Sequence, residues 1–436
     1  MYTRIIGVDL AVKTVHTAAI YDPASQKFLT KRMRFRSRPQ ELDRILDKAR
    51  EGLSGDVQII VVLEATNMSW FEVGQYFHRQ KVEVYRVNGR KTKALRRVDS
   101  PHAHSDKLDG MTLARLYVVG KDKLVRWTPP SGELLALQRM ARELQRIVGL
   151  QTATQQRLQD LTQWTWGGWN KLIPAPYQEW VMRNFYDPWT ATALGEEWLQ
   201  MQLKSVRPKA KTDWIPAWLK RAQERQQLYA EASVVGFDHV VPFVQRELEM
   251  MDWLAQRRSI LIKEEFLPLY RQLFPDDVLV TLRGVAERSA AIYHGFIITI
   301  QRFPNNKRFV QWTGMAPRSF QSGTVVNKRM RLSKQGPNLI KATLYQNAQV
   351  ARSWDIQLAK VYYEQMVQQG KHHTQAVCAV ASHLAARIYA LLRDQRPYQL
   401  QDLQGRPVSS QQARAYIQEH LQVPENIRKQ RKRRQS

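Results

Sequence analysis

The stretch Ser105–Arg115, SDKLDGMTLAR, has the features of a helix start and carries acidic residues in its first turn. Ser105 is a suitable N-cap, and early acidic residues interact favourably with the helix dipole. Asp106 and Asp109 are three residues apart, so their carboxylates lie on one helical face and repel each other. A divalent cation removes this repulsion, because hard cations prefer carboxylate oxygens. An isolated pair of this kind is more often only a solvated helix start.

The composition indicates a protein that binds a polyanion. The 436 residues include 67 Lys and Arg against 39 Asp and Glu, a formal net charge of +28, for which nucleic acid is the usual partner. This length suffices for two or three domains. The single cysteine, Cys378, excludes a disulfide framework and a cysteine-based zinc site. We see no signal peptide and no run of about 18 apolar residues, which predicts a soluble cytoplasmic protein without a membrane span, associated with the nucleoid when bound to DNA.

Residues 1–125 predict an α/β domain. The strands are expected at 4–10, 15–21, 27–35, 57–64 and 82–87, and the helices at 39–51, 70–80 and 105–119. Three successive strands followed by alternating helices and strands describe a ribonuclease-H-like (RuvC-like) fold. The whole chain is then α/β plus α, with a long helical middle and a mainly helical C-terminal domain.

Four acidic residues occur where this fold can bring them together. Asp9 lies in the first strand, Glu64 ends the fourth, and Asp106 and Asp109 begin a following helix. A buried strand seldom carries a carboxylate without a partner, because desolvating the charge is costly. Asp9 alone is better explained as a cap or a local ion pair. For the four acids in this order we predict a Mg²⁺ site that acts on a phosphate.

A dense run of cations precedes the acidic helix. Such a run suits a phosphate backbone that approaches the metal, although a solvated basic loop explains any one residue equally well. The predicted nucleic-acid contacts are Arg90, Lys91, Lys93, Arg96 and Arg97.

Residues 130–270 predict a helical region. Apolar residues at helical spacing run from Leu134 to Leu161 and again over about 240–267, which favours either an antiparallel hairpin or an oligomerising coiled coil. A tryptophan-rich insertion, about 164–235, separates the two helices. Tryptophans interleaved with cations can stack on RNA bases, but a small helical subdomain packed on its own tryptophans is the more ordinary explanation.

Residues 275–395 predict a third, mainly helical domain. A helix–glycine-turn–helix pattern spans 280–290, and its turn amides can hold a DNA phosphate. Further on, Ser322 precedes a glycine among many cations, where a serine can act as a nucleophile for phosphoryl transfer. Ser-Gly is usually only a turn, and no conventional base lies nearby. The surrounding cations that we assign to nucleic acid are Arg318, Lys328, Arg329, Arg331 and Lys334. Residues 396–436 are expected to form a basic tail, disordered from Arg428.

These motifs together resemble the insertion-sequence transposases that have an N-terminal DEDD, RuvC-like domain and a C-terminal serine domain, some of which are guided by a bridge RNA. The resemblance covers about 1–150 and 275–395 and leaves the tryptophan-rich insertion without a counterpart. Its motifs include Gly7-Val8-Asp9, Glu64-Ala65-Thr66, Ser105–Asp109, Gly314–Pro317, Gln321-Ser322-Gly323 and Ser333–Gly336. Gly110 stands where alanine is common, and Ala286 replaces the second glycine of the helix-hairpin turn.

The resemblance implies a composite active site. Asp9, Glu64, Asp106 and Asp109 would bind Mg²⁺, and Ser322 would attack the scissile phosphate to give a covalent phosphoserine–DNA intermediate; Ser319 is the alternative nucleophile. It also implies a homodimer or homotetramer on donor and target DNA, guided by a structured noncoding bridge RNA that pairs with both.

Other functions remain open at this point. A RuvC-like nuclease or Holliday-junction resolvase would use the same acids with water as the nucleophile. An actin- or hexokinase-type ATPase would need a second glycine-rich phosphate loop, which the sequence lacks. A non-enzymatic nucleic-acid scaffold would require the four acids to be unrelated.

Overall fold

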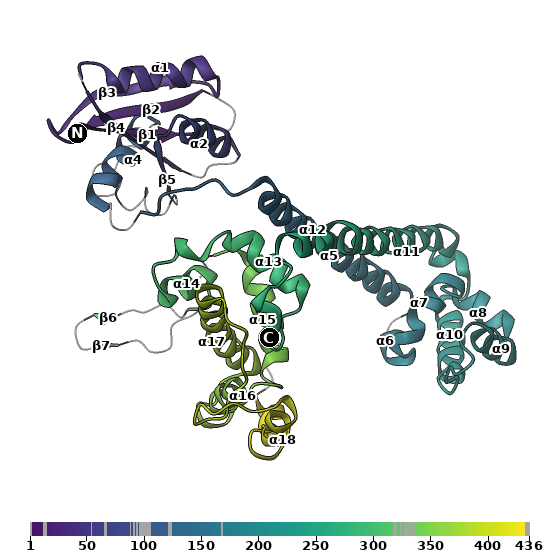
Figure 1. The fold of residues 1–436 in the computed structure, drawn as a ribbon. Coiled ribbons are helices and arrows are strands. Elements are labelled where there is room, and N and C mark those ends of the chain that lie inside the picture. The colour runs from purple at the N-terminus through teal and green to yellow at the C-terminus, as the bar shows by residue number, and fades with distance from the viewer. Residues whose placement is uncertain are drawn as a thin grey trace. The chain divides into compact units, whose positions relative to one another are not determined.

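The computed structural model describes residues 2–11, 15–53, 55–64, 68–87, 89, 92, 95, 106–120, 124–166, 169–316, 321–322, 325–326, 332 and 336–431. For residues 106–107, 164–165, 169–170, 321–322 and 325–326 it describes the backbone only. The chain forms two compact units, Met1–Ser131 and Gly132–Ser436. The first unit is a mixed α/β structure and the second is almost entirely helical (Figure 1), which confirms the predicted fold class at this level.

A five-stranded sheet in the order β3-β2-β1-β4-β5 forms the centre of the first unit. Its strands are β1 (Tyr2–Asp9), β2 (His16–Asp22), β3 (Lys27–Phe35), β4 (Val57–Glu64) and β5 (Glu83–Val87), each within two residues of its predicted bounds. β2 pairs antiparallel with β1 and β3, whereas β4 pairs parallel with β1 and β5. Parallel strands covered on both faces need continuous apolar runs, and the IIVVL run of β4 is buried throughout.

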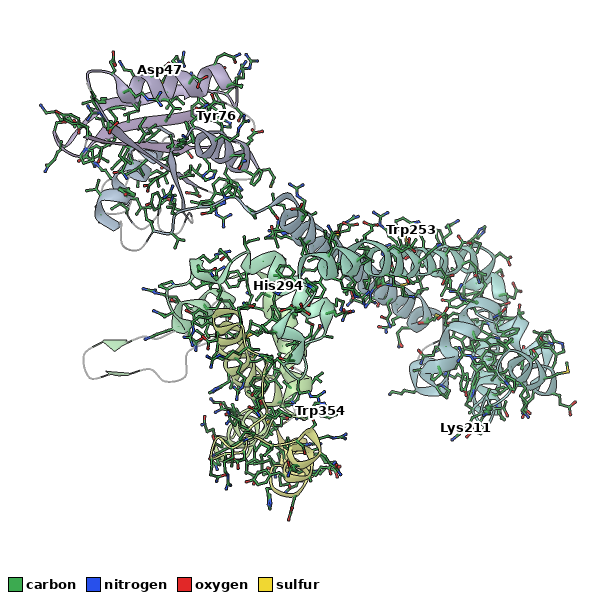
Figure 2. The ribbon with its side chains drawn as sticks, in the orientation of Figure 1. Asp47, Tyr76, Lys211, Trp253, His294 and Trp354 are labelled. Carbon is green, nitrogen blue, oxygen red and sulfur yellow. The ribbon has the colours of Figure 1, made fainter. Side chains whose placement is uncertain are left out.

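Helices cover both faces of this sheet. The apolar stripe of α1 (Pro39–Arg50) and the buried side of α2 (Ser69–Arg79) pack on one face. Tyr76 of α2 donates a 2.6 Å hydrogen bond to Asp43 of α1 and so joins the two helices (Figure 2). α4 (Asp106–Gly120) packs on the opposite face, where Leu113 and Tyr117 share a core with Ile5 of β1. The central strands of the sheet therefore lie between two hydrophobic cores.

The two long helices of the middle region form an antiparallel hairpin within the chain. α5 (Gly132–Trp166) packs along α11 (Phe237–Ile260), and the two lie side by side in Figure 1. Arg157 of α5 pairs with Glu247 of α11 at 3.0 Å, whereas Glu143, about four turns of helix earlier on α5, pairs with Arg257 at 3.4 Å. Rising residue numbers on α5 therefore meet falling numbers on α11, so the two helices run antiparallel, and the apolar contacts agree. Those contacts pair late α5 with early α11, around Leu158 and Val244, and earlier α5 with the end of α11, around Leu144 and Leu254.

The tryptophan-rich insertion is a small helical subdomain with its own core. Its helices are α6 (Trp169–Leu172), α7 (Ala175–Asn184), α8 (Pro188–Leu194), α9 (Glu196–Val206) and α10 (Ile215–Tyr229). Trp166 and Trp218 are fully buried, with ring centroids 5.8 Å apart, and Trp214 packs beside them. The buried rings support the ordinary explanation for these three tryptophans, which serve as core residues and are not available for base stacking.

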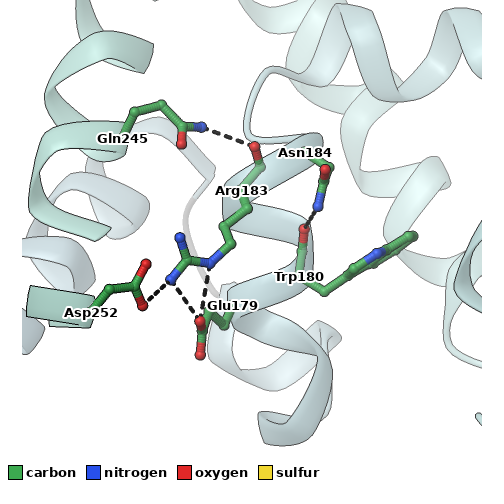
Figure 3. Close-up of polar contacts among 6 residues, drawn as sticks. All are labelled: Glu179, Trp180, Arg183, Asn184, Gln245 and Asp252. Carbon is green, nitrogen blue, oxygen red and sulfur yellow. Dashed lines mark hydrogen bonds and ion pairs between the residues drawn. The ribbon is translucent and has the colours of Figure 1, made fainter. Parts of the chain in front are cut away.

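Polar contacts fasten this subdomain to the hairpin (Figure 3). Arg183 of α7 donates hydrogen bonds to Glu179 of its own helix and, at 2.7 Å, to Asp252 of α11. Gln245 of α11 donates a 2.9 Å hydrogen bond back to the carbonyl of Arg183. Each of the two helices donates a hydrogen bond to the other, and together these contacts fix the orientation of α7 on the hairpin.

A large core organises the C-terminal part of the second unit. Its elements are the π-helical turn η3 (Leu261–Phe266), α12 (Leu267–Leu273), η4 (Val278–Thr281), α13 (Glu287–Ile297), η5 (Ile300–Arg302), α14 (Asn306–Thr313), β6 (Gln321–Ser322), β7 (Val325–Val326), α15 (Asn338–Ala351), α16 (Ile356–Tyr363), the π-helical turn η6 (Glu364–Gln368), α17 (His373–Asp394), α18 (Ser410–His420) and α19 (Glu425–Gln430). α17 is the central helix, with ten buried residues. Within the described residues it alone has the length and apolar composition of a membrane span, and its burial in this core accounts for that composition.

Two predictions for this part of the chain are wrong. Residues 396–431 are not a loose tail, because α18 and α19 fold onto the domain and Arg431 donates a 2.9 Å hydrogen bond to the carbonyl of Gly370. The segment before the glycine turn is the short 3₁₀ helix η4 and not an α-helix. Gly284 has φ +93°, and a Cβ there would lie 2.6 Å from the carbonyl oxygen of Asn347, so this position requires glycine. Ala286 has φ −102°, which any residue adopts, so its replacement of a glycine causes no strain.

A buried polar cluster joins α12, η4 and α13. The side chain of Asp277 is only 3% exposed, and it accepts hydrogen bonds from the hydroxyl of Tyr270 at 2.7 Å and from the backbone N–H of Leu279. It also lies 2.8 Å from Nε2 of His294, which is labelled in Figure 2. Burial alone would raise the pKa of Asp277, but the contact with His294 and the other hydrogen bonds outweigh it and lower the pKa below its usual value. The folded state therefore favours the ionised carboxylate.

This pKa shift predicts acid sensitivity of the second unit. A carboxyl with a lowered folded pKa stabilises the protein above its unfolded pKa, near 4, and that stability is lost as the pH falls through the folded value. Asp277→Asn is expected to cost about 1–3 kcal/mol at pH 7 and to flatten the loss of stability in acid. Urea unfolding at pH 7 and below pH 4 measures both effects. The exposed neighbour offers the control Asp276→Asn; equal effects of the two variants would contradict this role of Asp277.

Candidate active site

Asp9 and Glu64 end two neighbouring parallel strands. The register of β1 on β4 pairs Gly7 with Val62 and Val8 with Leu63, so the next pair along the strands is Asp9 beside Glu64. Adjacent strands lie about 4.8 Å apart, and paired residues of parallel strands face the same side. Asp9 alternates with Gly7 and Ile5, and Ile5 lies in the core under α4. Both acids therefore occupy the α4 face of the sheet, where both are half-buried.

Gly7 allows the backbone of α4 to lie directly on β1. A Cβ at Gly7 would lie 2.0 Å from the carbonyl oxygen of Gly110 and 2.4 Å from the amide nitrogen of Ala114, closer than any side chain can come. The first turns of α4 are thus held against the end of β1. Asp109, the residue before Gly110, is half-buried and belongs to the helix that covers the face of Asp9 and Glu64. Glycine within a strand marks a close backbone approach of this kind, so Gly7 is the sequence signal for this contact.

A second glycine leaves space beside Glu64. A Cβ at Gly89 would lie 2.4 Å from Oε1 of Glu64 and 3.0 Å from its carboxyl carbon. Without a side chain at this position, the carboxylate keeps its place at the end of β4. Gly89 is a further positioning residue that sequence reasoning missed.

The loop after Asp9 is anchored by His16. The backbone N–H of Ala11 donates a 3.2 Å hydrogen bond to Nδ1 of His16, so Nε2 carries the proton and faces the hydroxyl of Ser37 at 3.1 Å. Burial lowers the pKa of His16, only partly opposed by the charge of Glu72, which keeps the ring in the neutral form that these hydrogen bonds require. The neutral ring holds the exit of β1 and with it Asp9.

The acids fit a hard divalent cation by their chemistry. Asp9 and Glu64 share one face at the carboxyl ends of β1 and β4, Asp109 lies at the start of the helix packed on that face, and carboxylate oxygens are the ligands that Mg²⁺ prefers. The side chain of Asp106, the fourth acid, lies outside the described residues. In the part of the chain that is described, no group of three or more His, Cys, Asp or Glu side chains is close enough to hold a metal ion. A complete coordination sphere is therefore part of the proposal below.

Three residues are described in the basic segment that precedes α4, namely Gly89, Thr92 and Leu95. Thr92 is buried, and Leu95 packs against the core beneath α4. Leu95 therefore contacts the side of the sheet that carries Asp9 and Glu64. The five predicted nucleic-acid contacts, Arg90, Lys91, Lys93, Arg96 and Arg97, lie outside the described residues.

Ser322 belongs to the second unit. Its backbone is in β6, which pairs antiparallel with β7, and Ser322 itself pairs with Val325. Ser322 is the last residue of β6, and two residues separate it from its partner in the sequence. The side chain of Ser322 lies outside the described residues, as do Ser319, Arg318, Lys328, Arg329, Arg331 and Lys334.

Comparison with known families matches both parts of this arrangement. A family model for the DEDD transposases of IS110 elements, described as "Transposase", matches residues 6–165 and includes all four acids. A second, described as "Transposase IS116/IS110/IS902 family", matches residues 276–364 and includes Ser322. The chain carries both domains of the IS110-family transposases. Its two family domains flank the second half of the hairpin and the tryptophan-rich insertion.

Curated relatives agree with this family. A protein of the insertion element IS110 from Streptomyces coelicolor is 25% identical over 224 residues, which are 49% of this chain and 51% of that protein. Pilin gene-inverting proteins of Moraxella lacunata and Moraxella bovis are each 24% identical over 121 residues, 28% of this chain and 38% of theirs. The match therefore spans about half of the first relative's length and less of the others.

Proposed function

We propose that this IS110-family transposase cuts and rejoins DNA as the recombinase of an insertion sequence. The observation that supports the proposal is the register of β1 on β4, which sets Asp9 beside Glu64 at the carboxyl ends of two parallel strands, under the helix that carries Asp109. The strand order supports a ribonuclease-H-like, RuvC-like domain, and the family match supports DNA as the substrate. The names of the Moraxella relatives, which refer to gene inversion, point to the same class of reaction.

In this proposal the acidic residues act on the scissile phosphate through a divalent cation. Asp9, Glu64, Asp106 and Asp109 would hold it, and when bound it supplies a positive charge that offsets the charge developing on the phosphate oxygens. Other residues of the chain position these acids. Gly7 holds α4 against β1, and Gly89 leaves space for the carboxylate of Glu64. The cations of the basic segment would add attraction for the DNA backbone.

Ser322 is the proposed nucleophile. Its Oγ attacks the phosphorus, the bond from phosphorus to the leaving sugar oxygen breaks, and that oxygen leaves as a hydroxyl after taking up a proton. A sugar hydroxyl of the partner strand then attacks the phosphoserine ester and releases the serine. One phosphoester bond forms for each that breaks, so rejoining needs no external energy source.

We further propose a structured guide RNA and self-association, as in the bridge-RNA-guided members that the motifs resemble. The net charge of +28 suits a large nucleic-acid load. The outward side of α11 leaves Phe243, Met250 and Trp253 about half exposed, which suits contact with a second copy in a homodimer or homotetramer.

Metal-dependent cleavage tests the acidic site. We expect Asp9→Asn to lower the rate of strand cleavage in Mg²⁺ at least about a thousandfold, because a missing carboxylate weakens both the metal and its orientation. Removal of the cation with a chelator should stop wild-type cleavage, and added Mg²⁺ should restore it.

The control is Asp47→Asn, which alters an exposed acid on α1 of the same unit. It should cleave at the wild-type rate. A wild-type rate of cleavage in Asp9→Asn, or wild-type cleavage that continues in the presence of the chelator, would refute the metal site. Metal-dependent cleavage that leaves only free DNA ends would instead favour a RuvC-like nuclease or resolvase with water as the nucleophile.

A further inference from the structure

Four helices of the second unit bring a group of cations together around the end of α15. Arg352 caps the end of α15, Tyr362 lies near the end of α16, His373 begins α17, and Arg428 lies on α19. The guanidinium of Arg352 lies over the ring of Tyr362, 4.2 Å from its centroid. α19 packs on the turn η6, directly after α16. We call these four residues, with Gln349, the α15 cluster.

Hydrogen bonds fix the protonation state of this cluster. Oε1 of Gln349 accepts a 3.2 Å hydrogen bond from Nε of Arg352, so its amide nitrogen faces His373 and donates to Nε2 at 2.8 Å. The proton of His373 is then on Nδ1, which donates to the hydroxyl of Tyr362 at 2.7 Å. Burial and the charges of Arg352 and Arg428 lower the pKa of His373, in agreement with a neutral ring. The hydroxyl hydrogen of Tyr362 is left to donate to another acceptor.

No acidic partner of the two cluster arginines is found in the part of the chain that the structure describes. Among the described residues no carboxylate lies within ion-pair distance of Arg352 or Arg428, whereas Lys429, the next residue on α19, pairs with Glu425 at 3.0 Å. Arg352 is partly buried, and burial together with the charge of Arg428 lowers its pKa. Two cations that act on each other without a counterion destabilise the fold.

Further arginines lie near the ends of α15 and α19. Trp354, labelled in Figure 2 and two residues after Arg352, has Arg414 at 4.6 Å and Arg283 at 5.5 Å from its ring. Arg431, three residues after Arg428, lies beside Gly370, where the absence of a side chain leaves space for its guanidinium. The negative end of the α15 dipole amounts to about half an elementary charge, which is too little to balance these cations.

We propose that the α15 cluster binds a phosphate of a nucleic-acid backbone, with the guanidiniums of Arg352 and Arg428 as its main contacts. Arginine presents a planar set of donors that matches phosphate oxygens, and a phosphodiester supplies the missing negative charge. Arg428 is exposed and Arg352 partly so, which leaves the site open to a backbone. The inference rests on the proposed function only in taking nucleic acid as the ligand, and it adds a contact outside both the acids and the serine hairpin.

The salt dependence of binding tests this site in the full-length protein. A labelled DNA duplex and an RNA hairpin are titrated with wild type, Arg428→Gln and Arg428→Lys over a range of salt concentrations. Loss of one phosphate contact makes the negative slope of log K against log salt shallower by about 0.9. The affinity of the variant relative to wild type then falls by about eightfold more at 0.1 M salt than at 1 M. We expect this change in Arg428→Gln for at least one probe, with the slope restored in Arg428→Lys. The melting temperature should stay level or rise, because a like-charge repulsion is removed.

Lys429→Gln is the matched control, because it removes one positive charge from the same helix at a residue with an acidic partner. A smaller slope for Arg428→Gln on DNA alone assigns the site to DNA, and on RNA alone to RNA; a change on both assigns a shared phosphodiester contact. An unchanged slope on both probes, an equal change in Lys429→Gln, or a lowered melting temperature would overturn the proposal. Because the assay measures equilibrium binding, its outcome stays distinct from a failure of the proposed chemistry.

Discussion

Ser322→Ala is expected to lower the yield of rejoined DNA at least about a thousandfold, because the substitution removes the oxygen that forms the covalent bond to phosphorus. Binding of DNA should remain within about twofold, since a single hydroxyl adds little to a contact dominated by the phosphate charges. Turnover of a junction substrate and equilibrium binding, measured side by side, separate the two effects.

Ser319→Ala is the control for this prediction. Ser319 lies three residues before Ser322 in the same cation-rich segment, and it is the other serine that the sequence allows as nucleophile. It should retain rejoining within about tenfold. The reverse pattern, with loss in Ser319→Ala alone, would assign the attack to Ser319, and full activity in both variants would exclude a serine nucleophile.

Gly7→Ala is expected to destabilise the first unit by about 3 kcal/mol or more, near the upper end of the usual cost of overpacking. The added Cβ would lie 2.0 Å and 2.4 Å from backbone atoms of α4, and backbone cannot rotate aside as a side chain can. Since α4 carries Asp106 and Asp109, the helix must either shift off β1 or unfold with it. Thermal unfolding should show a fall of about 10 °C for this unit, together with loss of Mg²⁺-dependent cleavage.

Gly110→Ala is the matched control on the other side of this contact. A Cβ at Gly110 would lie 3.4–3.6 Å from Gly7 and Ala19, which is ordinary van der Waals contact. Alanine also has the higher helix propensity, by about 1 kcal/mol. Gly110→Ala should therefore be as stable as wild type or more so. A Gly7→Ala protein with normal stability and cleavage would show that the close approach of α4 does not position the acids.

The fold of the first unit could be predicted because its signals are local. The buried strands β1 and β4 are continuous apolar runs, and α1 has its apolar residues on one side, so each element is defined by its own sequence. The same holds for the position of each acid along the chain. Asp9 and Glu64 end strands whose bounds the pattern gives to within two residues.

The tertiary contacts that build the sites could not be predicted from such patterns. The role of Gly7 depends on which helix returns to β1, a contact between residues more than a hundred positions apart. α18 and α19 are short, polar helices whose stability comes from packing on the domain, so their basic sequence by itself predicts only a tail. The α15 cluster combines four separate helices, and no local pattern connects Arg352 with Arg428.

The most direct test of the account is to trap and map the covalent protein–DNA intermediate. Labelled junction DNA, RNA transcribed from the flanks of the gene and Mg²⁺ are mixed with the full-length protein, separated under denaturing conditions and digested with a protease for peptide mapping. The account predicts a protease-sensitive adduct on the peptide that contains Ser322, absent from Ser322→Ala and from Asp106→Asn. Cleaved DNA with free ends in wild type and in Ser322→Ala alike would contradict it.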